Sequence, residues 1–421
     1  MKIYIKKTGF IKSLGPGLLW AGAAIGVSHL VQSTKAGAVY GFSLVAIVIL
    51  ANIFKYPFFE FGTRYAASTG KNLLQGYREQ GRGIFGLYLV LTFGTMFTIQ
   101  AAVTIVTAGL LSWLTGNIIS PVLFAVIILS FSIVLLFFGN YSLLDRFMKV
   151  IIIVLTITTI VALIAAIGKQ GLKLKPGMAV PVLWDLQGIA FMIALMGWMP
   201  SAIDISVWSS IWTLEKRKET GYKQKLNEAL FDFNLGYIGT SVISLAFLTL
   251  GALVVFGSGE VLSKNGSIFA GQFISMYTKS IGSWSKYIIA IAAITTMFST
   301  TITCLDAFAR VLKESTKLIF PELENRKGEK LYWGWMLFVA TGAIILLSLL
   351  KGGMGFMVTL ATTLSFLTAP VLAVINFKVV TGKGMPAEGM PPKWLRWLSW
   401  AGIMFLTGFS SIFLYFRFFA N

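Results

Sequence analysis

The feature that most constrains this chain is a succession of apolar runs, each long enough to cross a lipid bilayer. A transmembrane helix needs about 20 consecutive, mostly apolar residues. Of the 421 residues, 56% are hydrophobic and 12% are charged, whereas about a quarter of a soluble domain is charged. The sequence therefore predicts an all-α polytopic membrane protein with about eleven transmembrane spans, at residues 14–36, 41–66, 84–114, 119–139, 146–168, 188–212, 229–256, 283–311, 332–350, 354–379 and 395–419.

The basic residues indicate how these spans are oriented. The net charge of +19 comes largely from short segments between the spans, a pattern that reflects topology and contact with lipid and argues against nucleic acid as a partner. Segments rich in lysine and arginine, such as 71–82, 216–225 and 310–330, alternate with poorer ones, although the 169–175 loop departs from this pattern. We therefore expect a cytoplasmic (inner) membrane protein with its N-terminus inside and its C-terminus outside.

Two of the spans contain residues that interrupt a helix. In the span 188–212, Gly197 and Pro200 lie just before Asp204, and proline both lacks an N–H group and crowds the preceding turn. Backbone groups freed inside a membrane must be satisfied by protein, water or a solute. An interrupted helix with an acid beside it therefore indicates a solute site, while a kink kept only for packing is the alternative.

The first span, 14–36, is interrupted in a similar way by several glycines and polar residues, among them Gly22, Gly26, Ser28 and His29. Interrupted helices that lie five spans apart are typical of two inverted repeats of five helices. We expect repeats at roughly 12–168 and 186–380 within one transporter domain that covers 1–421, followed by an extra helix at 393–419.

The chain lacks the signatures of an enzyme. It contains no Walker phosphate loop and no nucleophile elbow, and its glycine-rich pieces fall inside the predicted spans. A single histidine, His29, and a single cysteine, Cys304, exclude zinc sites built from several histidines and a disulfide within the chain. We therefore expect a protein that is not an enzyme and uses no cofactor.

Several short motifs occur in one order along most of the chain: Gly15-Pro16-Gly17, Ala36-Gly37-Ala38 with Gly41, Thr69-Gly70-Lys71-Asn72-Leu73, Met199-Pro200 and Ser299-Thr300-Thr301-Ile302-Thr303. In these motifs the chain resembles the NRAMP (natural resistance-associated macrophage protein) family of metal-ion transporters. The resemblance implies a LeuT/APC-type fold of 5+5 inverted repeats plus one helix. It also implies alternating access to a site between spans one and six.

The chain departs from that family at the expected metal ligands. Where the family carries Asp-Pro-Gly-Asn, this chain has Gly26-Val27-Ser28-His29, and Ser201 and Ser206 take the places of two histidines of the sixth helix. It therefore resembles a divergent branch that lacks the Asp-Pro-Gly-Asn motif. Manganese and ferrous iron prefer carboxylate or imidazole ligands, so this loss weakens the case for a hard dication.

The candidate solute-binding residues come from both interruptions: Gly26, Ser28, His29, Met199, Ser201 and Asp204. The resemblance keeps Met199 as a soft metal ligand, and with His29 it would suit a softer metal. A histidine hydrogen-bonded to backbone for packing, and an ion pair between Asp204 and Lys55, are the structural alternatives.

Residues for coupling or gating are expected outside the two interruptions: Lys55, Glu60, Thr300, Thr301 and Asp306. Lys55 and Glu60 are five positions apart on a helix and do not share a face, so each should have its own partner. The hydroxyls of Thr300 and Thr301 are suited to a coupling ion, although bonding back to their own helix is the alternative.

Together these observations predict a secondary active transporter that moves a small solute, with a metal cation as the first choice. The alternatives are a symporter of a small organic solute, such as an amine, amino acid or nucleobase, a sensor that does not transport, and an ion channel, although paired interruptions favour a carrier over a channel. If the coupling ion is a proton, His29 or Asp204 would carry it, and if it is sodium, the hydroxyls of span eight would bind it. The expected partners are the solute, the coupling ion and the lipid bilayer, and the protein is expected to be a monomer.

Overall fold

The computed structural model describes residues 15–138, 141–174, 180–323, 328–350 and 353–419, and within them all regular structure is helical. The helices of the first half are α2 (Pro16–Ala24), the π-helix η1 (Ser28–Ser33), α3 (Thr34–Tyr40), α4 (Val45–Thr69), α5 (Leu73–Gln80), α6 (Arg82–Leu114), α7 (Pro121–Phe137) and α8 (Tyr141–Gln170). Those of the second half are α9 (Leu186–Gly197), α10 (Ile205–Thr220), α11 (Leu226–Val254), α12 (Gly266–Ile281), α13 (Ser285–Ile319), α14 (Gly328–Leu349), α15 (Gly353–Thr381) and α16 (Lys393–Phe418), with the 3₁₀ turns η2 (Pro321–Leu323) and η3 (Ala387–Gly389).

Every predicted span corresponds to a helix or, for spans one and six, to two helices separated by a break. In the described part of the chain, seven helices are long and apolar enough to cross a membrane on their own: α4, α6, α11, α13, α14, α15 and α16. The interrupted spans fall short of that length because each of their halves is only part of a span. The all-α fold with interrupted first and sixth spans is therefore confirmed, while the short helices α5 and α12 lie outside the predicted spans.

Local sequence explains several helix starts. The Asn72 side chain accepts a hydrogen bond from the Gln75 amide while the Gln75 side chain accepts one from the Asn72 amide, so the two residues form a capping box for α5. Asp185 accepts a bond of 2.7 Å from the Gly188 amide and caps α9. Because these caps satisfy amides that have no partner within the helix, they set where each helix begins.

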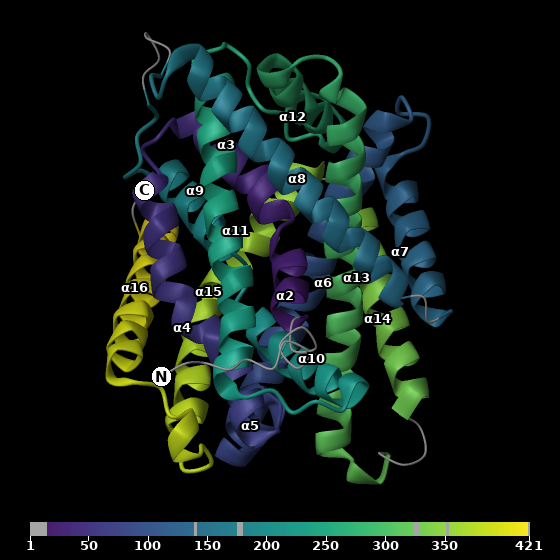
Figure 1. The fold of residues 1–421 in the computed structure, drawn as a ribbon, viewed down its shortest axis with the longest axis vertical. Coiled ribbons are helices and arrows are strands. Elements are labelled where there is room, and N and C mark those ends of the chain that lie inside the picture. The colour runs from purple at the N-terminus through teal and green to yellow at the C-terminus, as the bar shows by residue number, and fades with distance from the viewer. Residues whose placement is uncertain (1–14, 139–140, 175–179, 324–327, 351–352, 420–421) are drawn as a thin grey trace, which may run out of the picture.

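The long helices run roughly along one direction, with α5 near one end of the bundle and α12 near the other (Figure 1). The two interrupted pairs lie within the bundle: α2 and α3 pack against α11, and α9 packs against α15. In contrast, only 28% of the most apolar stretch of α14 and 22% of that of α16 is buried. In this arrangement the two breaks are buried, and α14 and α16 lie on the outside of the bundle.

Glycines allow the interrupted first span to lie directly against α11. A Cβ atom on Gly37 would lie 1.8 Å from the carbonyl oxygen of Leu248, and one on Gly251 would lie 2.4 Å from that of Thr34. Such backbone-to-backbone packing is a common way for membrane helices to associate, because lipid supplies little hydrophobic drive between them. The close contact between span one and α11 therefore depends on Gly37 and Gly251, which have no side chain to keep the two backbones apart.

Candidate functional site

The break in span one lies between the end of α2 at Ala24 and the start of η1 at Ser28. It is covered by α13: a Cβ atom on Gly26 would lie 2.7 Å from Thr300 Oγ1. The same hydroxyl lies 3.3 Å from the carbonyl oxygen of Ile25 and 3.2 Å from that of Thr296. A hydroxyl has one proton, so Thr300 satisfies one of these carbonyls at a time. The contact with Thr296 lies within α13, so one of the arrangements open to Thr300 is the alternative considered from the sequence, a hydroxyl bonded back to its own helix.

His29 is fully buried and points toward α11. Its Nε2 lies 3.0 Å from the carbonyl oxygen of Thr240, and its Nδ1 lies 2.7 Å from the Ser28 hydroxyl, which in turn lies 2.8 Å from the carbonyl oxygen of Ala24. Since a carbonyl only accepts, Nε2 carries a proton in this arrangement. Both ring nitrogens are thus engaged, and a metal would have to displace one of these bonds.

The break in span six is held by a lysine from span two. α9 ends at Gly197 and α10 begins at Ile205. The buried ammonium group of Lys55 donates hydrogen bonds to the carbonyl oxygens of Met196 at 3.0 Å, Gly197 at 3.1 Å and Ser201 at 2.6 Å. A cation at the carbonyl end of a helix is also favoured by the helix dipole. Lys55 therefore satisfies carbonyls that the interruption leaves without helical partners.

Asp204 lies at the other side of the same break, directly before the first residue of α10. It is buried, and its Oδ2 has no hydrogen-bond partner among the described residues. The ion pair considered from the sequence is not formed: within the described chain, Asp204 and Lys55 make no salt bridge within 4.0 Å, and Lys55 bonds carbonyls instead. The two groups nevertheless interact electrostatically. Each sits at the helix end whose dipole favours its charge.

The two breaks meet at one small cavity of about 30 Å³. That volume accommodates a solute the size of an ion or of about one or two water molecules. Residues of both interrupted spans line it together with residues of α6 and α13: Ala23, Ala24, Val27, Ser28, Ile99, Val103, Trp198, Ser201, Ala202, Ile205, Trp208, Thr300 and Cys304. Its polar side-chain groups are three hydroxyls, two indoles and one thiol.

Of the predicted solute-binding residues, Ser28 and Ser201 line this cavity, and so does Thr300 from the coupling set. Gly26, His29, Met199 and Asp204 are not among the lining residues of this conformation. Sequence reasoning missed Trp208 and Cys304, although helical spacing carried a signal: Cys304 follows Thr300 by four positions, so both lie on one face of α13.

The remaining coupling candidates have partners away from the cavity. Glu60 accepts two bonds from Arg64 Nε and one of 2.6 Å from Arg64 Nη2, so it has its own partner, as its spacing from Lys55 predicted. The Thr301 hydroxyl lies 2.9 Å from that of Thr107 on α6. Asp306 accepts a bond of 2.7 Å from Arg310 and another from the Tyr332 hydroxyl. These contacts join neighbouring turns or helices.

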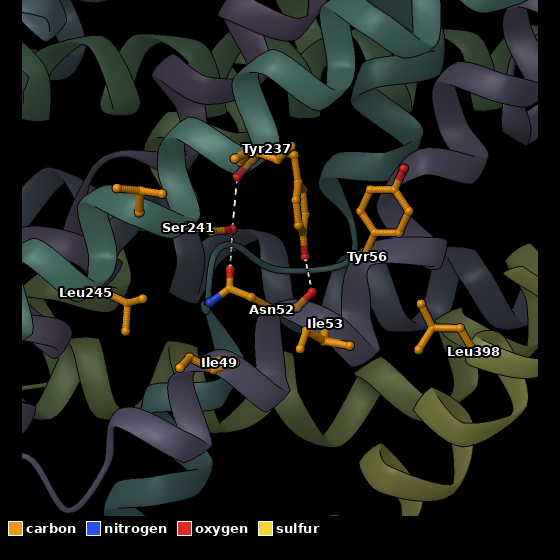
Figure 2. Close-up of a pocket in the computed structure, with 10 residues that line it drawn as sticks. Ile49, Asn52, Ile53, Tyr56, Tyr237, Ser241, Leu245 and Leu398 are labelled. Atoms are coloured by element: carbon orange, nitrogen blue, oxygen red, sulfur yellow. Dashed lines mark hydrogen bonds between the residues drawn. The ribbon is translucent and has the colours of Figure 1, made fainter. Parts of the chain in front are cut away.

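A larger groove of about 360 Å³ lies at the side of the bundle between α4, α11 and α16 (Figure 2). Its polar contacts are internal, since Ser241 donates to the Asn52 side chain and Tyr237 donates to the Asn52 carbonyl. Ile53 and Ile238 on its rim are 46% and 61% exposed. An apolar groove on the outer surface of a membrane bundle faces hydrocarbon, so we do not assign the solute to it.

Comparisons with known proteins place the chain in a family. The family model "Natural resistance-associated macrophage protein-like" matches residues 17–416. An uncharacterized protein of Pasteurella multocida is 38% identical over 405 residues, which cover 96% of this chain and 92% of that protein.

Solved structures agree on the fold. A manganese transporter of Eremococcus coleocola superposes with a TM-score of 0.70 at 16% identity and covers all of this chain and 90% of its own. MhsT in complex with L-phenylalanine superposes with a TM-score of 0.61 at 14% identity, covering 97% of this chain and 100% of its own. The predicted resemblance and the LeuT-type fold are thus confirmed, and the chain is a multi-pass membrane transporter, not an enzyme, that belongs to the Nramp family.

Proposed function

We propose that the chain is a secondary active transporter that carries a metal cation across the cytoplasmic membrane by alternating access. The observation that carries this proposal is the size and position of the cavity. It lies where the two interrupted spans meet, and its volume of about 30 Å³ suits an ion. A transporter fold places its solute site at such paired interruptions.

The donors around the cavity favour a soft metal over manganese. No carboxylate or imidazole lines it, whereas the Cys304 thiol, the Ser28 and Ser201 hydroxyls and Thr300 do. In the described residues, no three side chains of histidine, cysteine, aspartate or glutamate gather into a metal-binding group. A thiol that loses its proton supplies the anionic ligand that is otherwise missing, and thiolate prefers soft ions such as cadmium or copper(I).

The residues proposed for binding are accordingly Ser28, Ser201 and Cys304, with Gly26 shaping the break. His29 and Met199 remain proposed metal ligands for a conformation in which the His29 ring has released a partner. Asp204 is proposed for the coupling ion. We further propose that the protein is a monomer with its N-terminus inside and its C-terminus outside the cell. Its inverted repeats are proposed to cover roughly 12–168 and 186–380. The basic segments near α5 and the end of α10 support the orientation.

A small organic solute is the second candidate, because two indoles, Trp198 and Trp208, contribute to the lining. Aromatic walls with a few hydroxyls are typical of organic-solute sites. Such a solute requires the cavity to widen from its present volume when the transporter opens. MhsT, whose structure holds L-phenylalanine, has the same overall fold at low identity.

Uptake into proteoliposomes distinguishes these proposals. Cadmium and manganese uptake is measured beside labelled amino acids, amines and nucleobases, with Cys304→Ser as the test variant and Cys304→Ala as a second. We expect cadmium uptake in the native protein and a loss of about tenfold or more in both variants. Uptake of an organic compound that cadmium does not compete with would establish the second candidate. No flux of any compound would indicate a sensor.

A further inference from the structure

The carbonyl oxygens at the two interruptions have different partners. In span six, the ammonium group of Lys55 donates to the carbonyls at the end of α9. In span one, the Thr300 hydroxyl lies beside the carbonyls at the end of α2. Among the residues that the structure describes, no lysine or arginine bonds to the carbonyls of residues 21–25. The carbonyl end of a helix carries a partial negative charge that favours a cation, and at span one no described side chain supplies it.

Two carbonyls at the end of α2 have lost their helical partners. In an unbroken helix the carbonyl of Ile25 would accept from the amide of His29, but that amide bonds to Gly26 at 3.1 Å. The carbonyl of Gly22 would accept from the amide of Gly26, which lies beyond the end of the helix. Both oxygens lie near the Thr300 hydroxyl, at 3.4 Å for Gly22 and 3.3 Å for Ile25. The freed carbonyls thus gather around one hydroxyl oxygen.

The contacts of the Thr300 hydroxyl are longer than ordinary hydrogen bonds. Together with the contact to the Thr296 carbonyl, they range from 3.2 to 3.4 Å. Hydroxyl groups usually bond to oxygen at about 2.5 to 3.0 Å. On the same helix, Thr295 and Thr301 bond back to backbone carbonyls at 2.8 and 2.9 Å. One hydroxyl proton cannot satisfy three carbonyls, so hydrogen bonding alone does not account for this arrangement.

A bound cation accounts for the spacing of these oxygens. The oxygen ligands of calcium lie about 2.3 to 2.6 Å from the ion, and sodium has nearly the same ionic radius. Two ligands at right angles around such an ion are therefore roughly 3.3 to 3.7 Å apart. The contacts of Thr300 with Gly22 and Ile25 fall in that range. These oxygens are spaced like the ligands of an ion of sodium's size.

A second hydroxyl on α13 supports the same site. Thr296 precedes Thr300 by four positions, so both side chains lie on one face of the helix. The Thr296 hydroxyl is buried and has no hydrogen-bond partner among the described residues. A buried polar group without a partner is costly. A cation at this face of α13 would give both hydroxyl oxygens a partner.

The chemistry of these oxygens favours a monovalent ion. They belong to backbone carbonyls and hydroxyls, which are neutral, and Asp204 belongs to the other interruption. A dication gives up more hydration energy than neutral oxygens return, and dications are accordingly bound through carboxylates. Potassium is larger than sodium and requires its ligands to lie further apart. Sodium therefore fits both the charge and the spacing.

We propose that sodium binds between the end of α2 and α13, held by the carbonyl oxygens of Gly22 and Ile25 and the hydroxyl oxygen of Thr300, with the Thr296 hydroxyl beside them. The ion supplies to span one the positive charge that Lys55 supplies to span six. Thr300 also lines the solute cavity, so the ion fixes one wall of that cavity. Sodium is then the coupling ion, which rests on the proposed transport function, whereas its binding does not.

Sodium binding is tested on the full-length protein in detergent without any cargo. Sodium chloride is titrated against potassium chloride at constant ionic strength, and thermal unfolding and hydrogen exchange at residues 22–30 are measured. We expect sodium to raise the unfolding midpoint saturably, because a ligand that binds the folded state stabilises it. Sodium should also slow exchange at the end of α2. Potassium alone should do neither.

Three variants assign the response to the hydroxyl of Thr300. Thr300→Val keeps the shape of the side chain and removes its oxygen, so sodium affinity should fall by roughly tenfold or more. Thr300→Ser keeps the hydroxyl and should keep the sodium response. Thr295→Val is the matched control on the same helix and should behave like the native protein, because the Thr295 hydroxyl bonds back to the carbonyl of Ile291.

Two outcomes would overturn the inference. The first is a native protein whose unfolding midpoint and exchange are the same in sodium and in potassium. The second is native sodium affinity in Thr300→Val or, if that variant does not fold, in Thr296→Val.

The sodium site and the proposed cargo can fail separately. If cadmium, manganese and the organic panel are not transported while the sodium response depends on Thr300, the proposed cargo fails and the sodium site stands. If uptake is observed and sodium has no effect on unfolding or exchange, the sodium site fails and the proposed transport stands.

Discussion

The Lys55 ammonium group donates a hydrogen bond of 2.6 Å to the carbonyl oxygen of Ser201, a residue 146 positions away in the chain. This contact joins an uninterrupted helix, α4, to the non-helical segment between α9 and α10. It explains how a helix can be interrupted within a membrane protein. Backbone carbonyls that lose their helical partners inside the membrane need a hydrogen-bond donor from the protein itself, and Lys55 is that donor. The same contact supplies the first of four predictions.

Lys55→Met is expected to destabilise the protein by roughly 3 to 5 kcal/mol, because each buried acceptor that loses its donor costs about 1 to 3 kcal/mol. The methionine fills similar space but removes the lysine donor from the carbonyls of Met196, Gly197 and Ser201, of which Met196 keeps a bond of 3.3 Å from the Met199 amide. Thermal unfolding in detergent measures the loss. An unchanged unfolding midpoint would show that the three Lys55 contacts contribute nothing to stability, and Lys71→Met controls for the loss of a lysine.

Gly26→Ala is expected to destabilise the closed break by about 1 to 3 kcal/mol, because a new Cβ atom would lie 2.7 Å from Thr300 Oγ1 and 3.0 Å from its Cγ2. Thr300→Ala removes both of these atoms. The double variant should therefore recover much of the loss, and a double-mutant cycle of unfolding energies measures the coupling. Additive effects would contradict the contact.

Arg64→Met is expected to cost roughly 3 to 5 kcal/mol, because it leaves the Glu60 carboxylate buried without its cation. Glu60→Gln together with Arg64→Met should be much closer to the native stability, since neither charge remains. Chemical unfolding of the single and double variants tests this expectation. Equal losses in both would indicate that the Arg64 bond to the Gly389 carbonyl matters more than the ion pair.

Asp232→Ala is expected to loosen the start of α2. The Asp232 carboxylate accepts bonds from the amides of Gly15 at 3.2 Å and Gly17 at 2.6 Å, so it caps that helix from α11. Loss of such a cap costs about 1 to 2 kcal/mol. Hydrogen exchange at residues 15–20 should rise, with Asp232→Asn in between. Exchange equal to that of the native protein would exclude the capping role.

The sequence was informative where the cause of a structure is local. The span lengths follow from the hydrocarbon thickness, and Pro200 together with Gly197 predicts a break in span six. A proline alone is not sufficient, because Pro57 and Pro370 lie inside the unbroken helices α4 and α15. The placement of Gly26 and Ser28 at the other break was predictable for the same reason, as were separate partners for Lys55 and Glu60. Contacts between residues on helices that are far apart in the chain could not be predicted from the sequence.

What the sequence by itself determined is therefore the set of spans, the two interruptions and the family pattern, since each depends on residues that are neighbours in the chain. Only the tertiary structure decided that His29 faces Thr240 and that Lys55 bonds carbonyls of span six instead of Asp204. It also decided that Cys304 lines the cavity. A buried polar group is satisfied by whichever donors or acceptors packing brings within reach, and packing depends on the whole bundle.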